Sequence, residues 1–363
     1  MGQRPDLTVV ICAYESRRDL EHLLPTLVDQ QGPTLEIVVV DNHSQDGVGP
    51  WLAATYPEAR YLRAPQNQGY GWANNWGLRV ASGRYILVLN PDTELADGAL
   101  SQLFAAAERH PHALVTPKLV CDDGRVNACG LSVHFTGITT CRGLGEDPEG
   151  FRGDFSVPAV SGAAIMARRD TWRTLGGFDE RYFMYMEEVE LSLRARLRGY
   201  SLWCAADAVV RHHYALHMTA QKFYWLERNR LLTVAKLYGP ERMRQMRAAL
   251  RLIRGLTFLY AVRQGWEYLD AHRRAGAYMR QHRDELRRER WKSEQTRQVA
   301  EAAIFRDMTA RLELGQLLPA AANLARLEAW CERLFRRWAP VDVEKDPAEA
   351  STPSAAQRKA ASG

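Results

Sequence analysis

A short acidic turn follows a strongly apolar stretch, and its side chains are of types that bind a divalent cation. Tyr85–Leu89 holds five apolar residues without alternation, which is typical of a parallel strand covered on both faces. Pro91 cannot donate to a strand ladder, so Asp92 is expected at the carboxyl edge of the sheet, where α/β sheets bind ligands. With Asn90 and Glu94 it offers oxygen ligands for a cation that binds a diphosphate. A plain turn before a helix explains these residues equally well, so other parts of the chain have to decide.

Similar polar clusters follow other predicted strands or lie in the turns beside them. In chain order the four clusters are Ala13-Tyr14-Glu15, Asp41-Asn42, Asn90-Pro91-Asp92 and Glu187-Glu188. One or two such clusters could arise by chance, whereas four in chain order predict a shared ligand site. Acidic residues at a helix start are also expected from the helix dipole, and on spacing alone that explanation of Glu187 and Glu188 stays open.

The elements that must position these clusters alternate between strands and helices. Apolar runs predict strands at 7–13, 35–40, 59–62, 85–89, 114–120, 159–167, 201–204 and 208–210. Helical spacing predicts helices at 16–27, 51–56, 71–81, 97–110, 170–175 and 183–199, with a capping box at Ser16 and Asp19 and N-caps at Asp97 and Asp170. This order predicts an α/β fold with a mostly parallel sheet flanked by helices. The glycine-rich stretch 121–158 predicts a long surface insert near the ligand, with a hairpin around 126–140.

Length and composition are those of an ordinary globular protein. The 363 residues, 46% hydrophobic and 25% charged, suffice for one large domain and a smaller attachment. We expect an α/β domain at 1–238, a helical region at 239–338 and a disordered, low-complexity tail at 339–363. The six cysteines have no C-x-x-C spacing, which favours reduced thiols in the cytoplasm. No signal segment is recognised, and no apolar run approaches the roughly twenty residues that span a bilayer.

The net charge of +5 is unevenly distributed along the chain. Residues 241–300 contain fifteen Lys/Arg against seven Asp/Glu, and a predicted amphipathic helix there mixes arginines with large apolar residues. One explanation is a helix packed on the α/β domain or on a second subunit, as in a homodimer. The other is contact with an anionic membrane surface. The sequence therefore predicts a protein that is cytoplasmic or peripheral at the inner face of the cell membrane, with no nucleic-acid partner.

Seven stretches carry the strongest signal. They are V-V-I-C-A-Y-E-S, I-V-V-V-D-N-H-S-Q-D-G, N-Q-G-Y-G-W-A-N-N-W-G, Y-I-L-V-L-N-P-D-T-E, V-S-G-A-A-I-M-A-R-R-D, G-G-F-D-E-R-Y-F-M-Y-M-E-E-V-E-L-S-L-R and H-H-Y followed by K-F-Y-W-L-E-R-N-R. Together they resemble the family 2 inverting glycosyltransferases of GT-A fold, and within them the rhamnosyltransferase-like bacterial group. The resemblance covers about 7–238. It implies a Rossmann-like GT-A domain with a nucleotide-sugar half at 1–120, an acceptor half at 121–238 and a helical C-terminal extension.

The resemblance also implies an activity and roles for individual residues. A sugar would pass from dTDP-rhamnose or a UDP-sugar to a hydroxyl of a glycan or lipid-linked acceptor in cell-surface polysaccharide assembly. Asp92 would coordinate Mg²⁺ or Mn²⁺ bridging the diphosphate, with His212 as a further ligand and His213 less favoured. The nucleotide-sugar would contact Ala13, Tyr14, Glu15, Asp41, Asn67, Gly69, Asn74 and Asn90. The acceptor would contact Gly162, Asp179 and Glu180.

The general base follows from the implied reaction. An inverting transfer needs one carboxylate that accepts the proton of the acceptor hydroxyl. Relatives usually have Glu-Asp where this chain has Glu187-Glu188, so the base is assigned to Glu188, with Glu187 beside it. The extra methylene moves the carboxylate by about a bond length, which affects alignment. Asn90 stands where many relatives have the first Asp of Asp-x-Asp, and Asn-Pro-Asp is common in the rhamnosyltransferase-like group.

Other classes of protein fit less well. A dinucleotide-binding oxidoreductase would need G-x-G-x-x-G where this chain has A-Y-E-S after its first strand. A nucleotidyltransferase would need a glycine-rich basic loop there, and Arg17 and Arg18 alone do not make one. A non-catalytic nucleotide-sugar-binding or membrane-associated scaffold subunit remains open, because of the Glu-Glu turn and the long helical tail.

Overall fold

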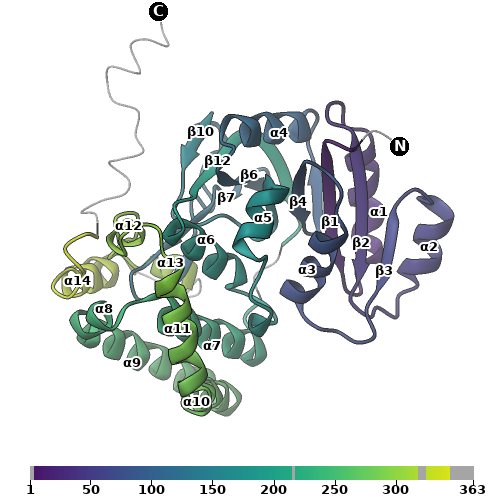
Figure 1. The fold of residues 1–363 in the computed structure, drawn as a ribbon. Coiled ribbons are helices and arrows are strands. Elements are labelled where there is room, and N and C mark those ends of the chain that lie inside the picture. Colours follow the sequence, from purple (N-terminus) through teal and green to yellow (C-terminus); the bar gives the residue numbers. More distant parts are fainter. Residues whose placement is uncertain (1–3, 215–216, 318–323, 344–363) are drawn as a thin grey trace, which may run out of the picture.

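The computed structural model describes residues 4–214, 217–317 and 324–343. Its centre is a sheet of ten strands in the order β10-β12-β6-β11-β4-β1-β2-β3, with β5 paired to β12 and β7 to β6 (Figure 1). The strands are β1 (Leu7–Ala13), β2 (Leu35–Asp41), β3 (Arg60–Arg63), β4 (Tyr85–Leu89), β5 (Thr93–Leu95), β6 (Ala113–Val120), β7 (Val126–Ala128), β10 (Asp154–Ser156), β11 (Ala164–Arg168) and β12 (Ser201–His212). A separate hairpin joins β8 (Leu131–Val133) to β9 (Thr139–Cys141).

The mostly parallel α/β architecture expected from the sequence is confirmed. Strands β4, β1, β2 and β3 run parallel, as do β6 and β12, whereas β11 lies antiparallel between β4 and β6. The helices within the α/β part are α1 (Arg17–Val28), α2 (Val48–Thr55), α3 (Tyr70–Val80), α4 (Ala99–Arg109), α5 (Arg169–Leu175) and α6 (Glu187–Leu197), with short 3-10 turns η1 (Pro148–Gly150) and η2 (Glu180–Tyr182).

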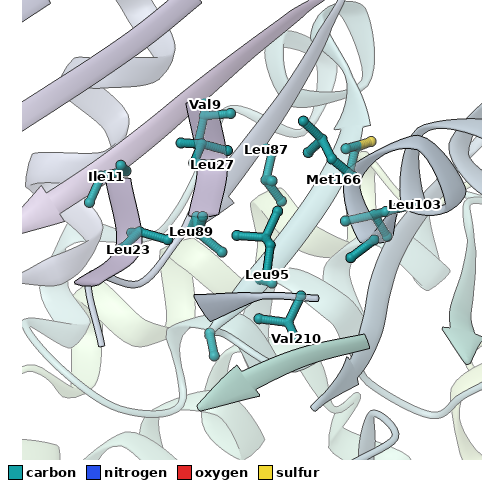
Figure 2. Close-up of a cluster of buried hydrophobic side chains, with 14 of the residues drawn as sticks. Val9, Ile11, Leu23, Leu27, Leu87, Leu89, Leu95, Leu103, Met166 and Val210 are labelled. Atoms are coloured by element: carbon teal, nitrogen blue, oxygen red, sulfur yellow. The ribbon is translucent and has the colours of Figure 1, made fainter. Parts of the chain in front are cut away.

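Both faces of the central strands are buried, as their unbroken apolar runs predicted. Val9 and Leu87 point to one face, where they meet Leu23 and Leu27 of α1 (Figure 2). The neighbouring residues Val10, Ile86 and Val88 point to the other face, toward α3, α5 and α6. Strand direction and burial therefore fix all the carboxyl ends of β1, β2 and β4 at one edge of the sheet.

Three predicted helix caps differ from the structure. Ser16 precedes α1, but its hydroxyl donates to the Tyr14 carbonyl, and Asp46 of the next loop accepts from the Arg17 amide instead. Helix α4 begins after Gly98, whose left-handed φ of 73° makes it the N-cap in place of Asp97. Asp170 likewise lies inside the first turn of α5, because Arg168 is the N-cap.

Three predicted segments differ from the structure. The strands expected at 201–204 and 208–210 form one strand, β12, because an irregularity between Ala205 and Val209 bends it without ending it. The strand expected at 159–167 is shorter and begins at Ala164. The insert at 121–158 does contain the expected β8–β9 hairpin and two further strands, β7 and β10. It is not confined to the surface, however, because Val126, Val133 and Phe135 are buried.

The C-terminal helices share a core with the α/β part. They are α7 (Ala220–Leu237), α8 (Pro240–Gln245), α9 (Arg247–Gln264), α10 (Trp266–Gln281), α11 (Arg283–Gln295), α12 (Ala302–Phe305), α13 (Leu314–Leu317) and α14 (Leu324–Arg336), and they gather on the side of the sheet away from β3 (Figure 1). Their buried residues, among them Leu232, Phe305 and Phe335, pack with Met186 and Val189 of the α/β part. No helix in the described ranges is long and apolar enough to cross a membrane.

The predicted disordered tail begins too early in the sequence. Asp342 forms an ion pair with Arg242, and Val343 is 9% exposed, so residues up to 343 pack against the helices. The remainder of the tail, 344–363, lies outside the described residues. All six cysteines, which the structure describes, are free thiols, as the spacing indicated.

Candidate active site

Asp92 and His212 are brought together by strand pairing between distant parts of the chain. Strand β5 follows Asp92 directly and pairs antiparallel with the end of β12, which places Thr93 opposite His212. The Asp92 carbonyl also accepts from the His213 amide at 2.9 Å. As a result Asp92 Oδ1 and His212 Nε2 lie 3.4 Å apart, and neither has a hydrogen-bond partner in the described structure. Two buried polar atoms without partners indicate a missing ligand.

Asn127 fixes the orientation of the His212 ring. Its Oδ1 accepts from His212 Nδ1 at 3.1 Å, which leaves Nε2 as the nitrogen with a free lone pair. The Tyr214 ring stacks on His212 at 5.3 Å between ring centroids. A histidine held in this way is prepared to bind a metal through its other nitrogen. Asn127 lies in the glycine-rich insert, and the sequence analysis did not identify it.

His213 has a different environment from its neighbour. Its Nε2 lies 3.0 Å from Glu94 Oε1 and its Nδ1 lies 2.6 Å from Asp122 Oδ1. Burial lowers the pKa of His213, but these two carboxylates outweigh burial and raise it above the ordinary value. Both ring nitrogens are engaged, which leaves Glu94 and His213 paired with each other and not directed at the Asp92 site.

The Glu187-Glu188 turn is held in an unusual backbone conformation. Phe183, Tyr185 and Met186 have φ values of 60°, 67° and 71°, a region that side-chain-bearing residues rarely adopt. The buried Asn229 of α7 donates from its amide to the carbonyls of Tyr182, Met184 and Tyr185. Because of this turn, α6 begins at Glu187 and not at Phe183 as predicted. Strain held by buried hydrogen bonds is typical of functional sites.

The two glutamates differ in exposure, and the pKa of each is raised. Glu187 is 5% exposed, and its Oε2 has no hydrogen-bond partner among the described residues. Burial and the nearby Glu188 carboxylate raise the pKa of Glu187 well above its ordinary range. Glu188 is half-buried, and burial raises its pKa to about 7, although backbone amides at the start of α6 oppose the shift. A carboxylate with a pKa near 7 suits proton transfer at neutral pH.

Tyr70 connects the Asp92 side of the site with the Glu187-Glu188 turn. Its hydroxyl donates to the Gly162 carbonyl at 2.8 Å, and a Cβ built on Gly162 would lie 3.4 Å from the Glu188 side chain. Burial raises the pKa of Tyr70, and the carboxylates of Glu187, Glu188 and Asp92 add to that shift. All three carboxylates therefore act electrostatically on one phenol group.

Asp41 is the last residue of β2 and is fully buried. Its Oδ1 accepts from the Ser44 amide at 2.7 Å, and its Oδ2 accepts from the Tyr61 hydroxyl at 2.5 Å and from Arg63 at 2.8 Å. The carboxylate thus positions Arg63, which is 44% exposed, at the carboxyl edge of β3. A direct contact between Asp41 and a nucleotide stays a prediction.

The loop after β1 is more accessible than Asp41. Tyr14 is 48% exposed, and Ala13, at the end of β1, is buried. Glu15 has a φ of 53°, and its carboxylate accepts from the Gln45 amide at 2.8 Å. The Tyr14 ring is therefore available to a ligand at this edge, whereas Glu15 ties the first loop to the second.

Polar residues near the start of α3 form a linked group. Asn67 Oδ1 accepts from Asn42 Nδ2 at 3.0 Å and from the Gly69 amide at 2.9 Å. A Cβ at Gly69 would lie 2.5 Å from the Phe183 carbonyl, so the glycine is required by this protein contact. Asn74 Oδ1 and Asn90 Oδ1 are buried without partners in the part of the chain described. Asn42 holds the two loops together and was not assigned a separate role from the sequence.

The predicted acceptor residues do not form one group. Gly162 lies against Glu188, as described above. Asp179 is 9% exposed and pairs with Arg181 at 2.6 Å and with Lys236 at 2.7 Å, which makes it part of a buried ion-pair network. These partners lower the pKa of Asp179 despite the opposing effect of burial. Glu180 is bound by Asn75 at 3.0 Å. Acceptor contacts of Asp179 and Glu180 stay predictions.

The residues at the Asp92 edge fit a divalent cation whose remaining ligands come from substrate and water. No group of three or more His, Cys, Asp or Glu side chains that could bind a metal occurs among the described residues. Asp92 and His212 therefore offer two ligands through their unpartnered atoms. Mg²⁺ sites commonly have one or two protein carboxylates, with substrate phosphates and water completing the shell. The pair fits a cation that arrives with a diphosphate.

Comparisons with known proteins bear on the family and the fold. A family model, Glycosyl transferase family 2, matches residues 8–175. An N-acetylglucosaminyl-diphospho-decaprenol L-rhamnosyltransferase of Mycobacterium tuberculosis is 30% identical over 240 residues, which is 59% of this chain and 78% of that protein. The O-antigen biosynthesis protein RfbC of Myxococcus xanthus is 30% identical over 240 residues, 60% of this chain but only 18% of its own length.

A solved structure shares the fold. The crystal structure of GalNAc-T7 with UDP, GalNAc and Mn²⁺ aligns with a TM-score of 0.53 and 16% identity, over 64% of this chain and 49% of that one. The α/β fold is therefore of the GT-A type. More specifically, the chain belongs to glycosyl transferase family 2.

Proposed function

We propose that this protein is a metal-dependent inverting glycosyltransferase of cell-surface glycan assembly, which moves a sugar from a nucleoside-diphosphate sugar to a hydroxyl of a lipid-linked acceptor. The observation that carries the proposal is the set of unpartnered buried atoms at one edge of the sheet: Asp92 Oδ1 and His212 Nε2 on one side, and Glu187 Oε2 on the other. These atoms lack ligands in the protein itself, and a nucleotide-sugar with its cation supplies them.

Asp92 and His212 would hold Mg²⁺ or Mn²⁺ on the diphosphate side. When bound, the cation stabilises the charge that develops on the departing nucleoside diphosphate. Asn127 keeps the His212 ring in the tautomer that exposes Nε2. The exposed Tyr14 ring and Arg63 lie at the same edge of the sheet, where a base and a ribose or phosphate are expected.

Glu188 is the proposed general base. It accepts the proton of the acceptor hydroxyl while that oxygen attacks the anomeric carbon from the face opposite the nucleotide. Its pKa of about 7 leaves a useful fraction ionised at neutral pH and makes it a stronger base than an ordinary carboxylate. Glu187, which is more deeply buried, would stay protonated, because two adjacent buried carboxylates resist carrying two charges.

The donor and acceptor classes are supported by the relatives. The mycobacterial relative is named as a rhamnosyltransferase acting on a diphospho-decaprenol sugar, and a Campylobacter jejuni relative, 27% identical over 184 residues, is named as a glucosyltransferase acting on a PP-undecaprenol glycan. We therefore infer dTDP-rhamnose or a UDP-sugar as donor and a sugar linked through diphosphate to a polyprenol as acceptor.

A panel of nucleotide sugars tests the proposal. Thermal shift is measured with UDP- and dTDP-sugars, each with Mn²⁺ and with a chelator, followed by release of free nucleoside diphosphate. We expect one donor to stabilise the protein only with Mn²⁺ and to be turned over when acceptor is added. Metal-dependent binding without turnover by any acceptor would instead favour the non-catalytic scaffold.

A further inference from the structure

An apolar groove lies beside the catalytic turn and takes no part in the proposed chemistry. It has a volume of about 400 Å³, within the range of small-molecule sites, and α7, α9 and α14 form its walls. Two of the charged residues in the walls, Glu227 and Arg230, pair at 2.8 Å and are almost fully buried. The third, Arg263 of α9, is exposed at the rim. The interior of the groove therefore presents a mainly hydrocarbon lining. Its apolar lining includes Phe223, Leu226, Ile253, Leu256, Leu314 and Trp330.

The outer rim of the groove exposes large apolar side chains. Leu259 of α9 is 62% exposed, and Leu327 and Trp330 of α14 are 45% and 50% exposed. Scattered single apolar residues on a surface need no explanation, but a group around a cavity indicates a binding site. The opening is therefore suited to an apolar ligand that continues beyond the groove.

The inner end of the groove reaches the catalytic turn. Met186 lines the groove and immediately precedes Glu187 and Glu188. Its sulfur accepts from the Thr139 hydroxyl at 3.5 Å, and Thr139 also lines the groove. A ligand whose apolar part occupies the groove therefore has its opposite end next to the proposed base.

A buried lysine lies where the groove and the catalytic site meet. Lys222 is 8% exposed, and no carboxylate of the described residues pairs with it. Its ammonium contacts the Tyr214 hydroxyl and lies 4.9 Å from the centre of the Tyr185 ring. Phe223, the next residue, lines the groove. A buried cation without a counter-ion is costly and favours an anionic ligand.

We propose that the groove binds the hydrocarbon chain of the lipid-linked acceptor, that Lys222 binds the phosphate groups joining chain to sugar, and that the sugar is thereby presented to Glu188. The groove, the buried cation and the catalytic carboxylate are neighbours, because Phe223 beside Lys222 and Met186 before Glu187 both line the groove. A polyprenyl diphosphate sugar joins three matching chemical groups: hydrocarbon, anion and hydroxyl. This inference rests on the proposed function and specifies how its acceptor is recognised.

Other occupants of the groove are less suitable. Residues 344–363 contain no large aliphatic or aromatic side chain, so their composition does not match the lining. A second copy of the chain could cover the exposed rim, but it would leave the cation of Lys222 uncompensated. The hydrocarbon chain of an anionic acceptor accounts for both features.

Direct binding to the full chain tests the inference without knowledge of the sugar. The probes are geranylgeranyl diphosphate and inorganic diphosphate, each titrated below its aggregation concentration by calorimetry. We expect geranylgeranyl diphosphate to bind at least about tenfold more tightly, because each buried methylene adds affinity. Leu259→Asp should remove this advantage. The matched control is Val262→Asp, which adds the same charge to an exposed residue of α9 outside the groove and should retain it.

Lys222→Gln tests the polar end of the groove. It should weaken geranylgeranyl diphosphate about tenfold and leave geranylgeraniol, which has no phosphate, unchanged. If Leu259→Asp and Val262→Asp change the affinity for geranylgeranyl diphosphate equally, the groove is not its binding site. The same holds if Leu259→Asp converts a dimer into monomers and no hydrocarbon chain binds to the protein. Loss of nucleoside diphosphate binding in Lys222→Gln, with lipid binding intact, would overturn the role of the lysine. Mn²⁺-dependent binding of UDP or dTDP is recorded separately, because its absence would contradict the proposed function and not this inference.

Discussion

Two groups of buried polar atoms lie at the same edge of the sheet and differ in how the protein satisfies them. Around Asp41, each carboxylate oxygen has a donor, supplied by Ser44, Tyr61 and Arg63. Around Asp92, the atoms facing the site lack partners among the described residues, and the same holds for His212. Both groups follow a parallel strand, so strand position alone does not explain the difference.

The difference separates a supporting network from a ligand-binding one. A buried group that is fully hydrogen-bonded contributes to folding and gives a defined shape before any ligand arrives. A buried group without a partner costs stability, and folded proteins keep it where a ligand provides the missing bond. Substitutions around Asp92 should therefore reduce activity more than stability, and substitutions around Asp41 should do the reverse.

The largest effect is expected for Asp92→Asn. The amide keeps the shape of the side chain but removes the charge that binds the cation, so turnover should fall at least about a thousandfold. Binding of UDP or dTDP should weaken only when Mn²⁺ is present, and calorimetry with and without a chelator measures this. An equal loss in the presence of chelator would show that Asp92 contacts the nucleotide without a metal.

The next effect concerns Glu188→Gln. Removing the base should lower kcat by about a hundredfold or more and leave donor affinity unchanged. Glu187→Gln is the matched control: it mimics a protonated carboxyl, so a much smaller loss of kcat is expected, with unchanged or higher thermal stability. If Glu187→Gln gives the larger loss of kcat, the base is Glu187 and the assignment is wrong by one residue.

Cation binding by Asp92 and His212 also depends on Asn127, which is not a predicted ligand of the cation. Asn127→Ala should weaken the affinity for Mn²⁺ by about 10- to 100-fold, because His212 loses the hydrogen bond that sets its ring orientation. The Mn²⁺ concentration that gives half-maximal activity measures this change. Saturating Mn²⁺ should restore most of the activity, whereas a failure to recover would assign Asn127 a different role.

These residues show which parts of the site could be predicted from the sequence. Asp92 and Asp41 follow strands of local βα units, so apolar patterning was enough to place them at one edge. Asn127 and Asn229 could not be found in this way, because they reach the site from a glycine-rich insert and from a distant helix. His212 was proposed from the resemblance, but its contact with Asp92 depends on pairing between β5 and β12, which are far apart in sequence.

The fold itself was predicted well where strands and helices alternate. It was predicted poorly where tertiary packing determines the helix ends and the partners of each helix. The capping box at Ser16 and the N-cap at Asp97 were wrong, because a neighbouring loop and a left-handed glycine determine these caps. The groove was not predicted at all. Its lining comes from α7, α9 and α14 together, and the amphipathic pattern of one helix does not reveal which partners cover its apolar face.

A smaller effect follows from the pKa of Glu188. The base must be ionised, so kcat/KM should rise about tenfold per pH unit at low pH and level off above a pH of about 7. In Glu188→Gln the residual activity should lose this dependence. A rise centred near pH 4.5 would mean that the carboxylate is solvated in the working enzyme and that burial does not tune it.

The smallest effect compares two single hydroxyl groups, one in each network. Tyr61→Phe removes one of the three donors to Asp41, so the protein should lose about 1 kcal/mol of unfolding free energy, seen as a lower thermal midpoint. Its kcat should change less than about threefold, because Ser44 and Arg63 still bind the carboxylate.

Tyr70→Phe also removes one hydrogen bond, which the Tyr70 hydroxyl donates to the Gly162 carbonyl. This hydroxyl, however, is influenced by the carboxylates of the proposed catalytic site. It should cost similar stability and lower kcat by more than Tyr61→Phe does. If the two variants lose kcat equally, the division into a supporting and a ligand-binding network is wrong.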